Sequence, residues 1–186
     1  PHVVTGPIEI RGAHPGDLLA MTVVETRRRV PYGVVSNRHG RGALPGEYPI
    51  GGATYSAFVT VEGDGEDARG VLPLSPSNPE PAARFPLAPF LGIMGVAAPG
   101  DVRPNSIQPG PHGGNLDITL LTVGATLYLP VNVEGALAYV GDPHFAQGDG
   151  EVALTALEAS LRATIRFDVI PACLLYTSPS PRDRTR

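Results

Sequence analysis

Glycine and proline constrain the fold of this chain more than any other feature of its sequence. The 186 residues include 23 Gly and 21 Pro, which fall between short apolar runs. Proline lacks a backbone N–H and glycine supplies the torsions that tight turns need, so both interrupt long helices. Short apolar runs with this punctuation are typical of strands joined by many loops. The sequence therefore predicts a mainly β fold.

The predicted strands are apolar runs that alternate with polar residues or lie between turn signals. In the last of them, Ile165, Phe167 and Val169 alternate with polar residues, which predicts one apolar and one polar face. We expect strands at residues 3–11, 18–30, 54–62, 115–121, 126–133, 136–141 and 162–170. Residues 38–49 and 73–89 are expected to form long irregular loops, and such loops are often functional.

A single segment has the periodicity of a helix. Between residues 151 and 161, Leu154, Leu157 and Leu161 fall on one side, and Asp149 precedes the segment as a helix-capping residue would. With one or two helices beside many strands, the predicted fold class is mainly β (α+β), and the architecture is sandwich-like or barrel-like.

The absence of lysine excludes several kinds of enzyme chemistry. All fourteen basic residues of the Lys and Arg count are arginine. Schiff-base catalysis and the Ser-Lys and Cys-Lys-Glu routes to amide hydrolysis therefore have no nucleophile or base here. The sequence also lacks a Gly-x-Ser-x-Gly elbow and a phosphate-binding Gly-x-x-x-x-Gly-Lys loop. The side chains that remain for catalysis are His, Asp, Glu, Asn and Gln.

Charge and cysteine content limit the partners and the compartment. The formal net charge is −4 at pH 7, and scattered arginines offer no basic surface to nucleic acid or anionic membrane. No run of about 18 apolar residues is present to cross a bilayer. Because Cys173 is the only cysteine, no internal disulfide can form. We therefore expect a cytoplasmic protein that binds neither nucleic acid nor membrane.

The densest group of polar side chains lies between residues 141 and 151. It contains Asp142, His144, Gln147, Asp149 and Glu151, between a predicted strand and the predicted helix. Oxygen and imidazole ligands for a divalent ion, with a carboxylate to accept a proton from water, are what metal-assisted hydrolysis needs. A purely structural explanation is the alternative. Asp149 would cap the helix, Glu151 would lie in its first turn, and Asp142 would form a turn. That alternative leaves His144 and Gln147 unexplained.

A second polar group follows paired glycines at residues 110–117. Asn115 and Asp117 are two positions apart, so within a strand they would share one face and point into one cavity. The glycines before them allow close approach of the backbone. An ordinary Gly-Gly turn with a polar strand start explains the same residues without function, and His112 could equally be a solvated loop residue.

Several motifs, taken in order and separation, resemble the acetamidase/formamidase family. They extend over nearly all of residues 1–170 and are specific only in combination. The matching runs are residues 2–8, 12–17, 89–96, 113–117, 127–131, 135–137 and 141–151. The resemblance implies a β-rich amidase that hydrolyses short aliphatic amides, such as formamide and acetamide, to the carboxylate and ammonia.

The resemblance also implies a divalent metal ion, with zinc or calcium as the candidates, and a homo-oligomer of two or more chains. We interpret residues 1–172 as a partial catalytic domain of this family that lacks the N-terminal and C-terminal parts. Residues 173–186 change abruptly to a polar, proline-broken composition, and we expect them to be a non-native tail.

The resemblance and the chemistry of the side chains together suggest roles for seven residues. Asp117 and His144 are the predicted metal ligands. The predicted catalytic residues are Glu151, Asp142 and His144. Glu151 is the predicted general base, and Asp142 is a further metal ligand or a carboxylate that orients its neighbours. The predicted substrate-binding residues are Asn115, Gln147 and His112, because their side chains can donate or accept hydrogen bonds.

Two other readings of the same residues remain open. In the first, the chain is a β-sandwich binding module whose acidic loop holds a structural Ca²⁺, although the imidazole of His144 is a poor ligand for calcium. In the second, the chain is an inactive fragment whose unpaired strand edges expose apolar surface.

Overall fold

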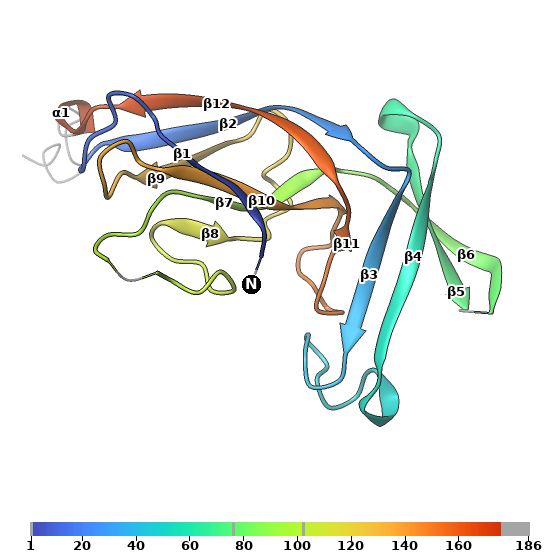
Figure 1. Cartoon of the computed structure of the whole chain (residues 1–186). Coiled ribbons are helices and arrows are strands. Elements are labelled where there is room, and N and C mark those ends of the chain that lie inside the picture. The colour runs from blue at the N-terminus through green and yellow to red at the C-terminus, as the bar shows by residue number, and fades with distance from the viewer. Residues whose placement is uncertain (1, 76, 102, 176–186) are drawn as a thin grey trace, which may run out of the picture.

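The computed structural model describes residues 2–75, 77–101 and 103–175, which form two antiparallel β-sheets (Figure 1). In chain order the strands are β1 (Val4–Ile8), β2 (Leu18–Arg28), β3 (Tyr32–Arg38), β4 (Thr54–Glu62), β5 (Arg69–Ser75), β6 (Asn78–Pro86), β7 (Phe90–Gly95), β8 (Gly113–Asn115), β9 (Thr126–Pro130), β10 (Ala138–Ala146), β11 (Leu157–Glu158) and β12 (Leu161–Ile170). The larger sheet runs β6-β5-β4-β3-β11-β10-β7-β8, with β1 paired to β10. The smaller sheet runs β12-β2-β9.

Helical elements within the described ranges are short. They are the 3₁₀ turns η1 (Ile50–Gly52) and η2 (Gly65–Asp67) and the helix α1 (Ala172–Leu175). None of the helices described is long and apolar enough to cross a membrane. The predicted mainly β fold class is confirmed.

The smaller sheet packs against β7 and β10 and encloses the first hydrophobic core. Leu19 and Met21 of β2 and Met94 of β7 are fully buried there. Ile165 and Phe167 of β12 pack against this core, and Arg166 between them is exposed, so the predicted alternation along this strand is confirmed. Burial of each large apolar side chain contributes about 1.5–3 kcal/mol to folding, which explains why these two layers stay together.

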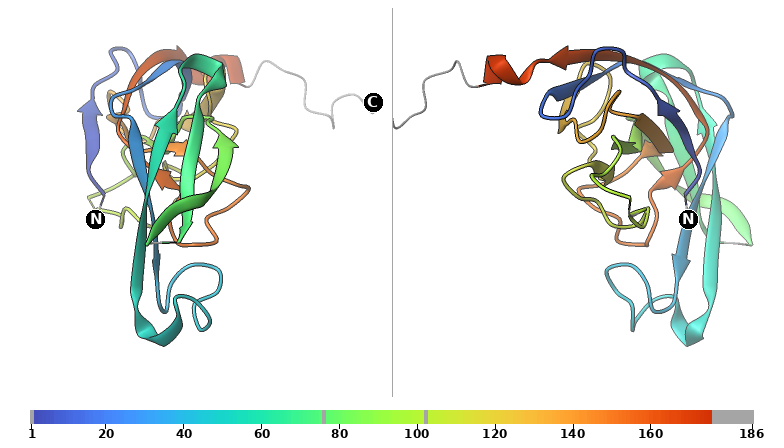
Figure 2. Two further views of the ribbon diagram at one scale, coloured as in Figure 1. Left: turned by 90° about the vertical axis from the view of Figure 1, so that its right-hand side faces the viewer. Right: turned by 60° about the vertical axis from the view of Figure 1, so that its left-hand side comes forward.

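Strands β3 to β6 form a wing that extends beyond the two-sheet body (Figure 2). A second core attaches the wing through Val59 of β4, Phe145 of β10 and Leu157 of β11. The short strand β11 lies between β10 and β3, with Glu158 opposite both His144 and Val34. Because side chains alternate along a strand, Phe145 faces this core while His144 points to the other side of β10.

Most predicted strands are present, and residues 54–62 match β4 at both ends. The loop predicted at residues 73–89 is wrong, because β5 ends and β6 lies there. Proline at 79, 81 and 86 suggested a loop, but β6 is an edge strand and an edge tolerates missing N–H donors. The strand predicted at residues 115–121 is also wrong, since β8 ends at Asn115 and Asp117 has φ of 47°.

The predicted helix at residues 151–161 is absent. Residues 151–156 form turns, Leu154 has φ of 99°, and β11 and β12 follow. A tertiary contact explains the difference: Thr155 Oγ1 accepts a hydrogen bond of 2.8 Å from the backbone N–H of Ser36 on β3. The leucine spacing that suggested a helix instead places Leu157 in the second core. The region before it is not a strand-to-helix loop either, because β10 continues to Ala146.

The predicted tail begins at a residue inside α1. Cys173 and its two successors belong to this short helix, and residues 176–186 lie outside the described residues.

Candidate functional site

His144 lies at the centre of the polar cluster and is fully buried. It stands on β10 two residues after Asp142, so both side chains leave the same face of the strand. The ring of Phe90 on β7 packs edge-on against the imidazole, with ring centroids 4.9 Å apart and an interplanar angle of 83°. This contact holds the imidazole in one orientation.

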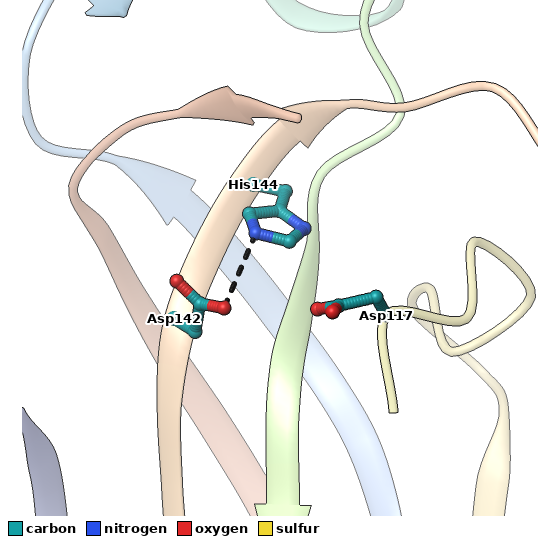
Figure 3. Close-up of side chains that lie close together, drawn as sticks. All are labelled: Asp117, Asp142 and His144. Atoms are coloured by element: carbon teal, nitrogen blue, oxygen red, sulfur yellow. Dashed lines mark ion pairs between the residues drawn. The ribbon is translucent and has the colours of Figure 1, made fainter. Parts of the chain in front are cut away.

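Three carboxylates surround one nitrogen of His144. Its Nε2 lies 3.5 Å from Asp142 Oδ2, 3.8 Å from Glu151 Oε1 and 3.2 Å from Glu158 Oε1. Asp142 comes from the same strand, and Figure 3 marks its ion pair with the imidazole. Glu151 and Glu158 come from the segment that the sequence suggested was helical.

Asp117 reaches the cluster from the loop after β8. Figure 3 shows its carboxylate pointing across β7 toward His144 and Asp142. Asn115 Nδ2 donates a hydrogen bond of 2.9 Å to Asp117 Oδ2, and Gln147 Nε2 donates one of 2.7 Å to the Asp117 backbone carbonyl. These two amides hold Asp117 in a left-handed conformation that aspartate tolerates better than most residues.

Gly92 on β7 leaves the space in which these side chains meet. A Cβ at this position would lie 2.5 Å from Asp117 Oδ1, 2.7 Å from His144 Cε1 and 2.9 Å from the Asp142 carbonyl oxygen. Such distances are far below van der Waals contact, so a side chain here would push Asp117 away from His144. Close approach therefore requires glycine at this point of the strand.

One backbone N–H orients both glutamates. The N–H of Ala156 donates to Glu151 Oε1 at 2.9 Å and to Glu158 Oε1 at 3.1 Å. Because both acceptors also lie near His144 Nε2, the turn at residues 151–156 brings two acids onto one imidazole. A regular helix would have placed Glu151 and Glu158 almost two turns apart.

Burial and neighbouring charges shift the pKa values of the cluster. Burial opposes protonation of His144, but the Asp142 and Glu158 carboxylates outweigh it and raise the pKa to about 10. Burial, followed by the charge of Asp117, raises the pKa of Glu151 to about 7. Burial also raises the pKa of Asp117, whereas for Asp142 contact with His144 outweighs burial and lowers the pKa. These directions follow from one imidazole among four carboxylates.

The donor set fits a divalent cation. His144 belongs to two groups of potential ligands. The first group adds Asp117 and Asp142, and the second adds Glu151 and Glu158. Within each group the donor atoms lie within 4.8 Å of one another. Asp117 Oδ1 and His144 Nδ1 are buried, and none of the described residues forms a hydrogen bond with either atom. Buried polar atoms without partners cost free energy, so a bound cation would remove that cost. Mixed nitrogen and oxygen donors favour zinc over calcium, which prefers oxygen alone.

A cavity of about 520 Å³ opens onto the cluster. Asp117, Asp142, Glu151 and Glu158 line it, and exposed Arg38 and Arg41 stand at its rim. This volume lies within the range of small-molecule sites, about 300–1,000 Å³. The arrangement can hold a small polar molecule against the carboxylates.

The structure gathers four of the seven predicted site residues around one point: Asp117, Asp142, His144 and Glu151. Asn115 binds Asp117 and lines the cavity, while Gln147 contacts the Asp117 backbone from outside it. His112 lies apart from the cluster and lines a neighbouring cavity.

Sequence reasoning missed Glu158 and Gly92. Glu158 falls within the segment at residues 151–161 that was expected to be a helix, and only a strand there pairs it with His144. Gly92 lies in the run 89–96, which contributed to the family resemblance but carries no polar side chain. Its function as a spacer depends on the approach of Asp117 from a distant segment.

Comparison with known proteins agrees with the motifs. The model of the acetamidase/formamidase family matches residues 103–178. An acetamidase of Mycolicibacterium smegmatis is 29% identical over 201 residues, covering 81% of this chain and 49% of its own length. A formamidase of Methylophilus methylotrophus is 27% identical over 192 residues, covering 81% and 47%.

A solved structure gives the same result for the fold. The crystal structure of an acetamidase from Bacillus halodurans is 35% identical, with a TM-score of 0.75 over 90% of this chain and 51% of that chain. The present chain thus spans about half the length of the relatives it matches. Its motifs, its sheets and these matches together relate this chain to the acetamidase/formamidase family.

Proposed function

We propose that this chain carries the site of a metal-assisted amidase that hydrolyses short aliphatic amides, such as formamide and acetamide, to carboxylate and ammonia. The observation that carries the proposal is the convergence of the buried imidazole of His144 with the carboxylates of Asp117 and Asp142, whose donor atoms lie within 4.8 Å of one another beside a cavity lined with carboxylates. The relatives named as acetamidase and formamidase supply the substrate class.

Three residues would hold the cation: Asp117, Asp142 and His144. Their donor atoms lie within 4.8 Å of one another, next to the space that Gly92 leaves open. When bound, a divalent ion supplies polarisation of the amide carbonyl and increased acidity of a nearby water molecule. Asn115 and Gln147 keep Asp117 in place, and support of this kind is worth about ten- to a hundred-fold in metal affinity.

Glu151 lines the cavity and is the proposed general base. Its carboxylate takes a proton from water as the water oxygen forms a bond to the amide carbon. It then gives that proton to the amide nitrogen as the C–N bond breaks. The products are the carboxylic acid and ammonia, which exchange a proton in solution. The N–H of Ala156 donates to both Glu151 and Glu158 and holds the two carboxylates near each other.

Ammonia release tests this proposal directly. The full chain would be assayed with formamide, acetamide and propionamide, before and after chelation and with zinc or calcium added back. We expect release that chelation abolishes and one of the two ions restores. A folded, metal-loaded chain that releases no ammonia would overturn the amidase and favour a binding module with a structural cation.

The variant Glu151→Gln isolates the base. Glutamine keeps the shape of the side chain but cannot take the proton, so turnover should fall at least about a hundred-fold. Glu47→Gln is the matched control, because Glu47 is exposed and does not line the carboxylate cavity. Equal activity in the two variants would remove Glu151 from the mechanism, even if amide hydrolysis itself were found.

A further inference from the structure

A second cavity adjoins the carboxylate cavity. Its volume is about 360 Å³, and it shares His2 and Asn115 with the first. The buried part of its wall is apolar: Ile93 is 1% exposed and Val96 is fully buried. Its polar residues are exposed, such as Gln108, or half-buried, such as His112 and Tyr139. The cavity is therefore an apolar chamber beside a polar one.

Asn115 stands at the junction of the two cavities. Its Nδ2 donates to Asp117 Oδ2, while its Oδ1 is buried and has no hydrogen-bond partner among residues 2–75, 77–101 and 103–175. A buried acceptor without a donor is unfavourable. The N–H of a primary amide is a donor of the required kind. An amide bound here would satisfy Asn115 and place its carbonyl near the carboxylates.

We propose that the apolar cavity binds the hydrocarbon chain of the amide substrate, so that the site takes aliphatic amides longer than acetamide. This inference rests on the proposed function and specifies its substrate class. Formamide and acetamide offer at most one methyl group to bury, whereas butyramide and hexanamide extend from Asn115 past Ile93 and Val96. His112 and Tyr139 form further parts of the wall and limit the width of the chain.

The affinity for amides of increasing length tests this proposal. Acetamide, butyramide and hexanamide would be titrated into the metal-loaded full chain, and the methyl resonances of Ile93 followed by NMR. Each buried methylene should tighten binding about three- to four-fold. Equal affinity across the series, or no shift at Ile93, would overturn the proposal.

A variant that fills the apolar cavity provides a second test of the proposal. Ala98 lines the apolar cavity and does not line the carboxylate cavity, so Ala98→Phe should abolish the gain with length and leave acetamide binding unchanged. Ala98→Ser is the matched control and should keep the gain. A length dependence that Ala98→Phe leaves intact would place the hydrocarbon chain elsewhere and reject this cavity.

Ammonia release in the same samples separates this inference from the proposed function. Release without any dependence of affinity on length would reject the apolar cavity and support the amidase. A gain in affinity with length, without release from any amide, would support the cavity as an amide-binding site and reject hydrolysis.

Discussion

At Gly92, the absence of a side chain determines which residues can meet. Asp117 arrives from one side of β7 and His144 from the other, and both pass within reach of the position that a Cβ would occupy. The cluster therefore depends on a residue that has no functional group of its own. The cluster also depends on the backbone N–H of Ala156, which donates hydrogen bonds to both Glu151 and Glu158 although the alanine side chain has no functional group.

Replacing Gly92 with alanine should weaken metal binding without unfolding the chain. The new Cβ would lie 2.5 Å from Asp117 Oδ1, so this carboxylate must move away from His144. Changes beside metal ligands typically reduce affinity about ten- to a hundred-fold, which calorimetric titration with Zn²⁺ would measure. Gly46→Ala is the control, because nothing lies within 4 Å of a Cβ there. Equal affinity in both variants would contradict the prediction.

Among single residues, sequence reasoning identified side chains with chemistry and missed those that act through position. Three residues lie close together in the sequence and carry groups that can bind a metal ion or accept a proton: Asp142, His144 and Glu151. The sequence alone was therefore enough to identify them. Glu158 needed the pairing of β11 with β10, and Gly92 needed the approach of Asp117. Both depend on contacts between distant segments, which a local pattern does not contain.

The strand β11 has two residues but joins two parts of the molecule. It pairs with β10 on one side and β3 on the other, and its Leu157 is 3% exposed in the second core. Gly33 on β3 lies close beneath it, since a Cβ there would be 2.6 Å from Leu157 Cδ1. The same short strand positions Glu158 at His144. Attachment of the wing and assembly of the site are therefore coupled.

The substitution Leu157→Ala should destabilise the chain by about 2–5 kcal/mol, because it leaves a cavity in the second core. Urea unfolding followed by circular dichroism would measure the change in the free energy of unfolding. Val152→Ala, at a position 61% exposed in the same segment, should change it by no more than about 0.5 kcal/mol. Similar losses in the two variants would mean that Leu157 does not anchor the wing.

Strands with alternating faces were predictable, and fully buried strands were not. Thr54–Glu62 and the strand at β12 have clear punctuation or alternation, and both were found. All six residues of β7 are buried, so this strand shows no alternation between faces. The segment at residues 151–161 has helical spacing, yet contacts with β3 and the second core decide its conformation.

At the scale of the whole molecule, Asp17 joins segments that are far apart in the sequence. Its Oδ1 accepts a hydrogen bond of 2.8 Å from the N–H of Ala172, and its Oδ2 accepts one of 2.9 Å from the N–H of His14. The residue is 8% exposed. Asp17 thus fixes α1, at the end of β12, against the turn that precedes β2.

These hydrogen bonds make stability depend on pH. The N–H of His14, followed by that of Ala172, lowers the pKa of Asp17 below its usual value of 3.8. A carboxylate with a lowered pKa in the folded state stabilises the fold above its unfolded pKa, and this stability is lost as pH falls through the folded pKa. The contact with Glu134 raises the pKa of His14, so its contribution changes only above its usual value of 6.5. Between pH 5 and pH 3, therefore, the contribution of Asp17 to stability changes and that of His14 does not.

The variant Asp17→Asn should accordingly lose stability at pH 5 and show a weaker further loss between pH 5 and pH 3 than the unaltered chain. Urea unfolding at both pH values would give the two free energies of unfolding. Asp149→Asn is the control, because Asp149 is exposed and should leave the pH dependence unchanged. An Asp17→Asn variant whose stability falls with pH as steeply as that of the unaltered chain would show that the link to α1 does not carry the acid sensitivity.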